Sequence, residues 1–252
     1  MVAETIALPN IRKFFIPDAG HIIVDADLSG ADAQVVAAEA EDERLLEAFR
    51  EGKSVHVMNV RDVFSHKVKG WSDEAIKATN HSNGIYYNCK RAVHGTNYGG
   101  SARAIAAATN WTIFEAEDFQ RNWFGAHPGI YNWHRRTEQQ LATNRTVSNR
   151  FGFRRVYFDR VEGLLPEALA WVPQSTVALV TDTAALRLWE QKRDFVQILM
   201  QVHDSLVFQI PMSKRNELPG LLDLMLVEIP YDPPLTIPWG HKSSTVSWGD
   251  CE

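Results

Sequence analysis

Two short apolar runs, far apart in the chain, each lead to an aspartate. The first covers residues 22–26 and is followed by Asp27, and the second covers residues 195–210 and contains His203 and Asp204. Short apolar runs bounded by polar residues are typical of β-strands, and the second run predicts two strands about a tight turn. An ionised aspartate beside buried strand residues is costly unless it is paired, hydrogen-bonded or bound to a cation. The two runs therefore predict a pair of acids that share a partner.

Helical periodicity dominates the chain between the two runs. It predicts two helices within residues 30–49 and further helices over residues 54–64, 88–100, 115–124, 130–143, 166–189 and 218–227. Glycines at positions 95, 99 and 100 are expected to interrupt one of these helices, at a cost of about 1 kcal/mol each. Short apolar segments predict a hairpin over residues 146–158 and strands over residues 235–238 and 245–247. This order predicts an α+β fold whose sheet is built from both ends of the chain.

The composition is that of an ordinary globular protein. The 252 residues are 45% hydrophobic, which is enough for a core in one large domain or two modest ones. The net charge of -5 argues against a protein that binds polyanions through its overall charge. Between Lys90 and Arg160, however, eleven basic residues stand against five acidic ones, and this local charge of +6 favours a nucleic-acid track.

Cysteine usage and the N-terminal sequence indicate a reducing compartment. Cys89 and Cys251 form neither a disulfide framework nor a zinc-binding spacing. The N-terminal residues lack a basic segment before a long apolar run. No uninterrupted apolar stretch approaches the roughly 20 residues of a membrane helix. We therefore expect a cytosolic protein with no membrane partner.

One predicted helix between the two acids carries charges and rings at regular spacing. Lys90, His94 and Tyr98 are four residues apart and share one helix face, and Arg91 lies beside them. A lysine can hold a triphosphate while a ring at the other end of the face stacks on a base. Magnesium would satisfy the two distant acids, because Mg²⁺ is usually held by one or two carboxylates together with substrate phosphates. These patterns favour phosphoryl chemistry on a nucleotide.

Three motifs, in this order along the chain, resemble the palm and fingers of DNA polymerase family A, the DNA polymerase I type. They are Val-Asp-Ala-Asp-Leu-Ser at residues 24–29, the run from lysine to Tyr-Gly at residues 90–99, and Gln-Val-His-Asp at residues 201–204. Weaker similarities lie at residues 10–12, 45–56, 127–129, 152–157, 173–176 and at Trp248. The resemblance therefore extends over nearly the whole chain.

The resemblance implies a fold and a division of the chain. The expected fold is α+β, with a palm of antiparallel sheet and packed helices and a mostly helical fingers insertion. Residues 1–45 and 163–252 are expected to form the palm, and residues 46–162 the fingers. Because few residues precede Asn10, thumb and exonuclease domains are expected to be absent. Either a second polypeptide supplies them, which is the expectation, or the chain is a non-processive remnant.

The resemblance also implies template-directed addition of a deoxynucleotide to a primer 3′-hydroxyl, in the cytoplasm of a bacterium or a phage-infected host. Two Mg²⁺ ions are expected on Asp27, Asp204 and the backbone carbonyl of Leu28, with Lys90 as a further catalytic residue. The residues expected to bind the dNTP are Lys90, His94, Tyr98, His56, Asp32 and Arg91. Those expected to bind primer–template DNA are Gln174, His203, Arg154 and Arg155.

The chain departs from the family pattern at several positions. Tyr86 replaces a fingers arginine that holds phosphate. One phosphate contact is therefore absent unless Arg91 supplies it from the next helical face. Asp32 is one methylene shorter than the glutamate that excludes ribose, a change that could loosen sugar selectivity by roughly 1–3 kcal/mol. Gln34 replaces an arginine, and Ser205 replaces a glutamate near the metals.

These departures leave a second function open, a DNA-binding subunit of a replication or repair assembly that has lost efficient catalysis. The retained Asp27, Asp204 and Lys90 oppose it. Another two-metal phosphoryl-transfer enzyme, such as a nuclease, ranks last because the sequence offers no arrangement that would activate water.

Most of these residues also have an ordinary structural explanation. An aspartate at a strand end is usually a turn residue or a helix cap, and Asp25 keeps this interpretation although it shares a strand face with Asp27. Lys90 would ordinarily be a solvated charge, Tyr98 a core residue and His56 a buried histidine.

Overall fold

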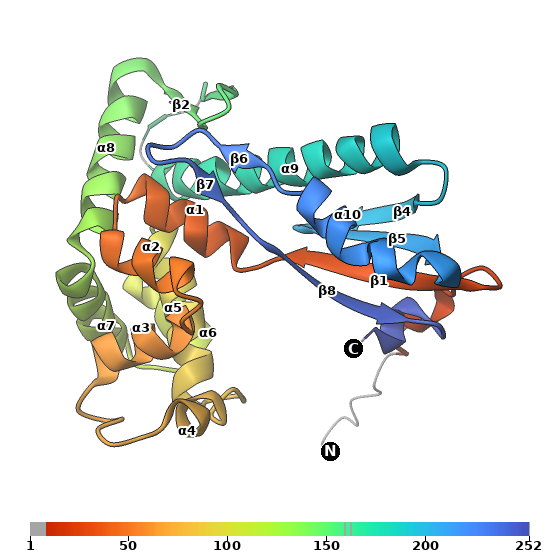
Figure 1. Ribbon diagram of the computed structural model, residues 1–252. Helices are drawn as coiled ribbons and strands as arrows, with labels where there is room; N and C mark the ends of the chain where they lie inside the picture. The colour runs from red at the N-terminus through yellow and green to blue at the C-terminus, as the bar shows by residue number, and fades with distance from the viewer. Residues whose placement is uncertain (1–8, 159, 162, 252) are drawn as a thin grey trace. The chain divides into compact units, whose positions relative to one another are not determined.

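The computed structural model describes residues 9–158, 160–161 and 163–251, whose elements are drawn in Figure 1. The chain divides into two compact units, the first containing residues 1–31 and 177–252 and the second containing residues 32–176. One of these boundaries falls within the long helix α9, Leu165–Lys192. The division into palm and fingers at residues 45/46 and 162/163 remains a prediction.

The first unit is built on a four-stranded antiparallel sheet with the order β4-β5-β1-β8. Its strands are β1 (His21–Leu28), β4 (Gln197–Val202), β5 (Ser205–Pro211) and β8 (Trp239–Ser244). Figure 1 shows β1, in red, next to strands coloured in shades of blue, because the two ends of the chain share this sheet. The α+β fold and the sheet built from both ends of the chain are therefore confirmed.

Shorter elements complete the first unit. They are η1 (Ile11–Phe14), η2 (Met212–Glu217), α10 (Leu218–Leu224), η3 (Trp248–Asp250) and the small pair β6 (Glu228–Ile229) and β7 (Leu235–Thr236). The half of α9 in this unit buries Val180, Ala184 and Leu188, which repeat every four residues and form one apolar face. Ile23, Val207 and Trp248 form a buried cluster on the sheet.

The second unit is mostly helical. Its helices are α1 (Ala31–Glu39), α2 (Glu43–Arg50), α3 (Val55–Phe64), α4 (Asp73–Lys77), α5 (Ile85–Asn97), α6 (Ala102–Thr109), α7 (Ile113–Ala126) and α8 (Pro128–Asn144), followed by the hairpin β2 (Thr146–Ser148) and β3 (Arg154–Val156). Its largest apolar cluster joins α3, α5, α6 and α7, with Phe119 and Trp123 fully buried. This cluster holds α5, which carries the charged and aromatic face predicted from the sequence.

A buried histidine bridges two acids within the second unit. The Nδ1 atom of His127 lies 2.7 Å from a carboxylate oxygen of Asp42, and its Nε2 atom lies 3.5 Å from one of Asp62. The histidine side chain is 0% exposed and each carboxylate only 7%. Asp42 also caps α2 by accepting from the Leu45 amide, and the half-exposed Arg44 pairs with the buried Asp62 carboxylate. The network therefore ties together three separate segments.

Two local predictions need correction. The strand predicted at residues 245–247 is wrong, because β8 pairs with β1 through Ser244 opposite Ile23 and the chain bends beyond that point. Gly95 does not interrupt its helix, since α5 continues to Asn97. Gly99 adopts a left-handed φ of 71° just after the helix ends, a conformation that favours glycine.

Candidate active site

The two predicted acids converge in the first unit. Asp27 stands at the end of β1, directly opposite Ser205 at the start of β5. Asp204 lies in the two-residue turn that joins β4 to β5, and its backbone carbonyl accepts a hydrogen bond of 3.1 Å from the Leu28 amide. His203, the other turn residue, has a left-handed φ of 55°. The antiparallel register thus brings together two aspartates that are far apart in the sequence.

Both acids line one cavity of about 540 Å³. The other residues around it are Arg12, Asp25, Ser29, Val202, His203, Ser205, Gly240, His241 and Lys242. Burial raises the pKa of Asp27 to about 6, and the neighbouring carboxylates of Asp204 and Asp25 add to the effect. The acids therefore repel one another, and a bound cation would relieve that repulsion.

The donor set fits magnesium better than a metal that needs a protein cage. Within residues 9–158, 160–161 and 163–251, no group of three or more His, Cys, Asp and Glu side chains could hold a metal ion. Mg²⁺ does not require such a group, because it usually keeps several waters and binds one or two carboxylates plus substrate phosphates. Asp27 and Asp204 supply that number of carboxylates.

Magnesium affinity is expected to fall as the pH is lowered through about 6, the pKa of Asp27. Below that value a proton occupies the carboxylate and must leave before the metal can bind, so affinity drops up to about ten-fold per pH unit. Isothermal titration with Mg²⁺ between pH 5 and pH 8 measures this dependence. The Asp27→Asn variant should bind weakly with little pH dependence, and a flat profile in the unsubstituted protein would contradict the assignment.

Asp25 differs from the other two acids in its contacts. One of its carboxylate oxygens accepts a hydrogen bond of 2.7 Å from the indole Nε1 of Trp248. The other oxygen is buried and has no hydrogen-bond partner among the described residues. The contact with Trp248 agrees with a structural interpretation of Asp25, although this acid lines the same cavity as Asp27.

A second cavity, of about 370 Å³, lies within the second unit. All six residues predicted to bind a nucleotide line it, namely Asp32, His56, Lys90, Arg91, His94 and Tyr98. Three of them are on α5, Tyr98 is its C-cap, one is on α1 and one is on α3. The helix spacing predicted the α5 face, and packing of α1 and α3 adds the other two residues.

Hydrogen bonds fix the aromatic end of this cavity. The Tyr98 hydroxyl donates to a carboxylate oxygen of Asp32 at 2.8 Å. Burial and the adjacent Asp32 carboxylate raise the pKa of Tyr98, so the phenol stays protonated. The His94 ring meets the Tyr98 ring edge-on, with centroids 4.6 Å apart. Tyr98 is thus held between a carboxylate and an imidazole.

The cationic end is more exposed. Lys90 and Arg91 are both solvent-accessible, and Arg91 donates a 2.8 Å hydrogen bond to the Tyr87 hydroxyl. Burial, with a contribution from Lys90, lowers the pKa of His56 to about 4, so this imidazole is neutral at pH 7. Its Nδ1 atom is buried without a hydrogen-bond partner among the described residues. His56 can therefore contact an anion only as a neutral donor.

Tyr86, which the family resemblance sets in place of a fingers arginine, packs beside the second cavity. Its ring packs edge-on against His56, with centroids 5.9 Å apart, and its backbone amide donates to the Thr79 hydroxyl at 3.0 Å. Tyr86 thus covers His56 rather than presenting a charge, and Arg91 is the cation that lines the cavity nearby.

Of the four residues predicted to bind DNA, His203 lines the cavity of the first unit. The other three line neither that cavity nor the cavity of the second unit. Gln174 is exposed on α9, Arg154 is exposed on β3, and Arg155 forms an ion pair with Glu167. Sequence reasoning missed Lys242 and His241 in the acidic cavity, because it placed the strand that carries them too late in the chain.

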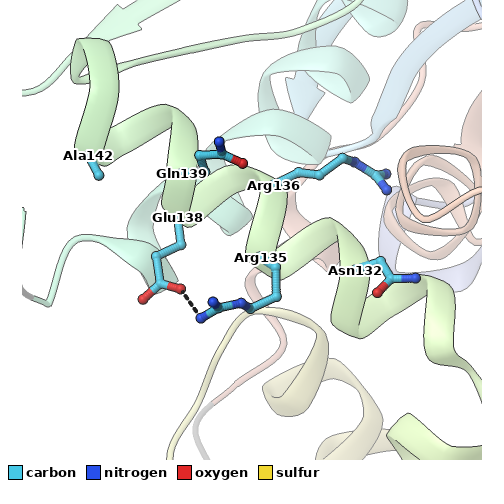
Figure 2. Close-up of a pocket in the computed structure, with 6 residues that line it drawn as sticks. All are labelled: Asn132, Arg135, Arg136, Glu138, Gln139 and Ala142. Carbon is cyan, nitrogen blue, oxygen red and sulfur yellow. Dashed lines mark hydrogen bonds and ion pairs between the residues drawn. The ribbon is translucent and has the colours of Figure 1, made fainter.

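A third hollow, of about 510 Å³, lies along α8 and is drawn in Figure 2. Arg135 points toward Glu138, with the two charged groups 2.8 Å apart, and Arg136 extends away from them to the Glu39 carbonyl at 2.7 Å. Both partners of the Arg135–Glu138 pair are more than half exposed. Surface pairs of this kind contribute little to stability.

Comparisons with known proteins find similarity to DNA polymerases over nearly the whole chain. The family model described as DNA polymerase family A matches residues 3–245. A DNA polymerase of Mycobacterium phage D29 is 28% identical over 208 residues, covering 82% of this chain and 32% of that protein. The thermostable DNA polymerase I of Thermus filiformis is 29% identical over 240 residues, covering 92% of this chain and 28% of that protein. The chain thus spans about a third or less of these relatives.

A solved structure has a similar fold. It is the POL domain of Pol1 from M. smegmatis in complex with DNA primer-template and dNTP, with a TM-score of 0.79 and 23% sequence identity. The match covers 96% of this chain and 42% of that one. In the part of the chain that the structure describes, no helix combines the length and apolarity needed to cross a membrane.

Proposed function

The chain belongs to DNA polymerase family A, and we propose that it forms the catalytic palm and fingers of a DNA-directed DNA polymerase. It adds a deoxynucleotide to the 3′-hydroxyl of a primer paired with a template strand. We base this proposal above all on Asp27 and Asp204, which are far apart in the sequence and line one cavity of the first unit. In this assignment residues 1–45 and 163–252 are the palm and residues 46–162 the fingers.

Two Mg²⁺ ions are the proposed cofactors, held by Asp27, Asp204 and the Leu28 carbonyl. When bound, they lower the pKa of the primer hydroxyl and stabilise charge on the departing pyrophosphate. The carboxylates serve this role because they are already crowded and repel one another. Ser205 donates its hydroxyl to the Val202 carbonyl at 3.0 Å instead of adding a charge.

The cavity of the second unit is the proposed dNTP site. Lys90 and Arg91 at its exposed end neutralise the triphosphate, and the neutral His56 imidazole donates a hydrogen bond to it. Tyr98 and His94 supply ring surfaces for the base and sugar. The hydrogen bond from Tyr98 to Asp32 holds both side chains in place at the sugar end.

Primer–template DNA is the proposed partner, together with parts of a longer polymerase or of a second polypeptide that grip the duplex. His203 is proposed to contact the primer end, and Gln174, Arg154 and Arg155 to contact the DNA strands. Phosphate contacts supply much of the affinity of proteins for DNA. The 252 residues alone are therefore expected to bind DNA weakly and to extend primers with low processivity.

Primer extension tests the proposed function. The purified chain, with and without a candidate thumb-bearing polypeptide, is incubated with a labelled primer–template, dNTPs and Mg²⁺. We expect template-dependent extension that stops when EDTA is added. Binding of DNA with no extension under either condition would favour the non-catalytic DNA-binding subunit instead, and shortening of the DNA would favour a nuclease.

A further inference from the structure

The cavity that contains the acid pair also has a cationic side. Arg12, in η1, and Lys242, in β8, both line it together with Asp27 and Asp204. Among the residues that the structure describes, no carboxylate lies within ion-pair distance of either cation. Both side chains are exposed. Two cations therefore face the cavity with their charges available to a ligand.

Contacts with the C-terminal segment hold Arg12 in place. Its guanidinium lies over the Trp248 ring, 4.4 Å from the ring centroid. The same indole donates to Asp25 at 2.7 Å and meets the Phe15 ring edge-on at 5.8 Å. A guanidinium stacked on an aromatic face keeps its outer N–H groups free to donate.

A second set of contacts joins η1 to η3. The Trp248 amide donates to the Phe15 carbonyl at 2.8 Å. Lys13 pairs with Asp250 at 3.4 Å. Gly249 packs closely on Lys13, because a Cβ atom added to Gly249 would lie 2.6 Å from the Lys13 Cγ atom. Contacts between η1 and η3 therefore fix the position of Arg12.

Lys242 is placed by strand register. It lies directly opposite Asp25 on the neighbouring strand, so both side chains are on the same face of the sheet. Gly240, two residues earlier on β8, lies opposite Asp27 and has no side chain. On this face, β8 has no side chain beside Asp27, and the next side chain along the strand is the cationic Lys242.

We infer that Arg12 and Lys242 bind the sugar–phosphate backbone of the nucleic-acid strand whose end lies at the Asp27–Asp204 pair, an inference that rests on the proposed function. An extended polyanion fits because the two cations come from different elements and line the same cavity as the acids. A strand has phosphates at regular steps, which can meet cations spread along a cavity wall. The cavity of the second unit has cations of its own, Lys90 and Arg91, for a free nucleotide.

The salt dependence of DNA binding tests this inference without catalysis. A fluorescein-labelled primer–template is titrated with protein at several salt concentrations between 20 and 150 mM, in EDTA, and binding is followed by fluorescence anisotropy. Arg12→Gln and Lys242→Gln remove one charge each while keeping a polar side chain over the same surface. Each variant should weaken binding about five-fold near 150 mM salt and lower the slope of log K against log salt by about 0.9. In the double variant, the slope should fall by about twice that amount.

Two exposed arginines of the same unit, Arg193 and Arg215, do not line the cavity and provide matched controls. Their glutamine variants should leave the slope unchanged. Unchanged slopes in the Arg12 and Lys242 variants, or no DNA binding by the unsubstituted protein even at 20 mM salt, would overturn the inference. So would weaker binding of a labelled dNTP with an unchanged DNA slope, because the ligand would then be a free triphosphate. Primer extension is measured separately, so that failure of the proposed function and failure of this contact are distinguishable.

Discussion

Replacing Asp204 with asparagine should abolish Mg²⁺-dependent primer extension while leaving the fold intact. The asparagine has the same size and remains in the turn between β4 and β5, where the backbone hydrogen bond to Leu28 does not involve the side chain. The variant loses one of only two carboxylates proposed to hold the metal. Metal ions contribute several kcal/mol to stabilising charge in such reactions, so the rate should fall by about 10³-fold or more.

Single-turnover primer extension with saturating dNTP measures this loss. Asp194→Asn is the matched control, because Asp194 is exposed in the segment just before β4 and does not line the acidic cavity. That variant should extend primers at the rate of the unsubstituted protein. Circular dichroism checks that both variants are folded. If the Asp204 variant extended primers as fast as its control, the metal site would have to lie elsewhere.

The convergence of the two acids could be predicted from the sequence because strands follow simple rules. Each aspartate ends or follows a short apolar run, and a tight turn between two strands fixes antiparallel pairing. The position of β8 in the sequence could not be predicted in the same way. Its residues Gly240, His241 and Lys242 are polar or small and give no alternating signal, so the strand was placed too late and the cationic wall of the cavity was missed.

The lining of the cavity proposed to bind the nucleotide was predictable in part for a similar reason. Spacing along one helix put Lys90, His94 and Tyr98 on a single face without any knowledge of the fold. Asp32 and His56 entered only through the family resemblance, since nothing local connects them to α5. The hydrogen bond between Tyr98 and Asp32 joins residues 66 positions apart, and the burial that lowers the pKa of His56 depends on how the helices pack. Such long-range contacts leave no periodic pattern in the sequence.

The network around His127 was not predicted at all. Asp42, Asp62 and His127 are spread over the chain, and the histidine belongs to a His-Pro-Gly segment that indicates only a break between helices. Burial alone would lower the pKa of His127, but its contacts with the two carboxylates outweigh burial and raise it. Burial likewise acts to raise the pKa of Asp42, yet the hydrogen bonds from His127 and the Leu45 amide lower it overall. The bridge thus favours an imidazolium between two carboxylates.

Replacing His127 with phenylalanine should therefore destabilise the protein by about 3–5 kcal/mol, since it removes the hydrogen bond to the buried Asp42 carboxylate and leaves Arg44 as the remaining counter-charge of Asp62. His134→Phe is the matched control. His134 is also buried, but its Nε2 atom meets only the Asn97 carbonyl, at 2.9 Å, so its loss should cost about 1–3 kcal/mol. Equilibrium unfolding in urea at pH 6 measures both free energies. Equal losses in the two variants would show that the carboxylates are not held by a charge on His127.

The pH dependence provides an independent check on the same bridge. A histidine whose pKa is raised by folding stabilises the native state fully below its unfolded pKa of about 6.5. That stabilisation is lost as the pH rises through the folded value, so the free energy of unfolding should decline above pH 6.5. The pKa of His134 is lowered by burial, against the effect of its backbone hydrogen bond, so His134→Phe should keep the decline. An unfolding free energy that stayed level or rose from pH 6.5 to pH 9 would mean that His127 is neutral in the folded protein.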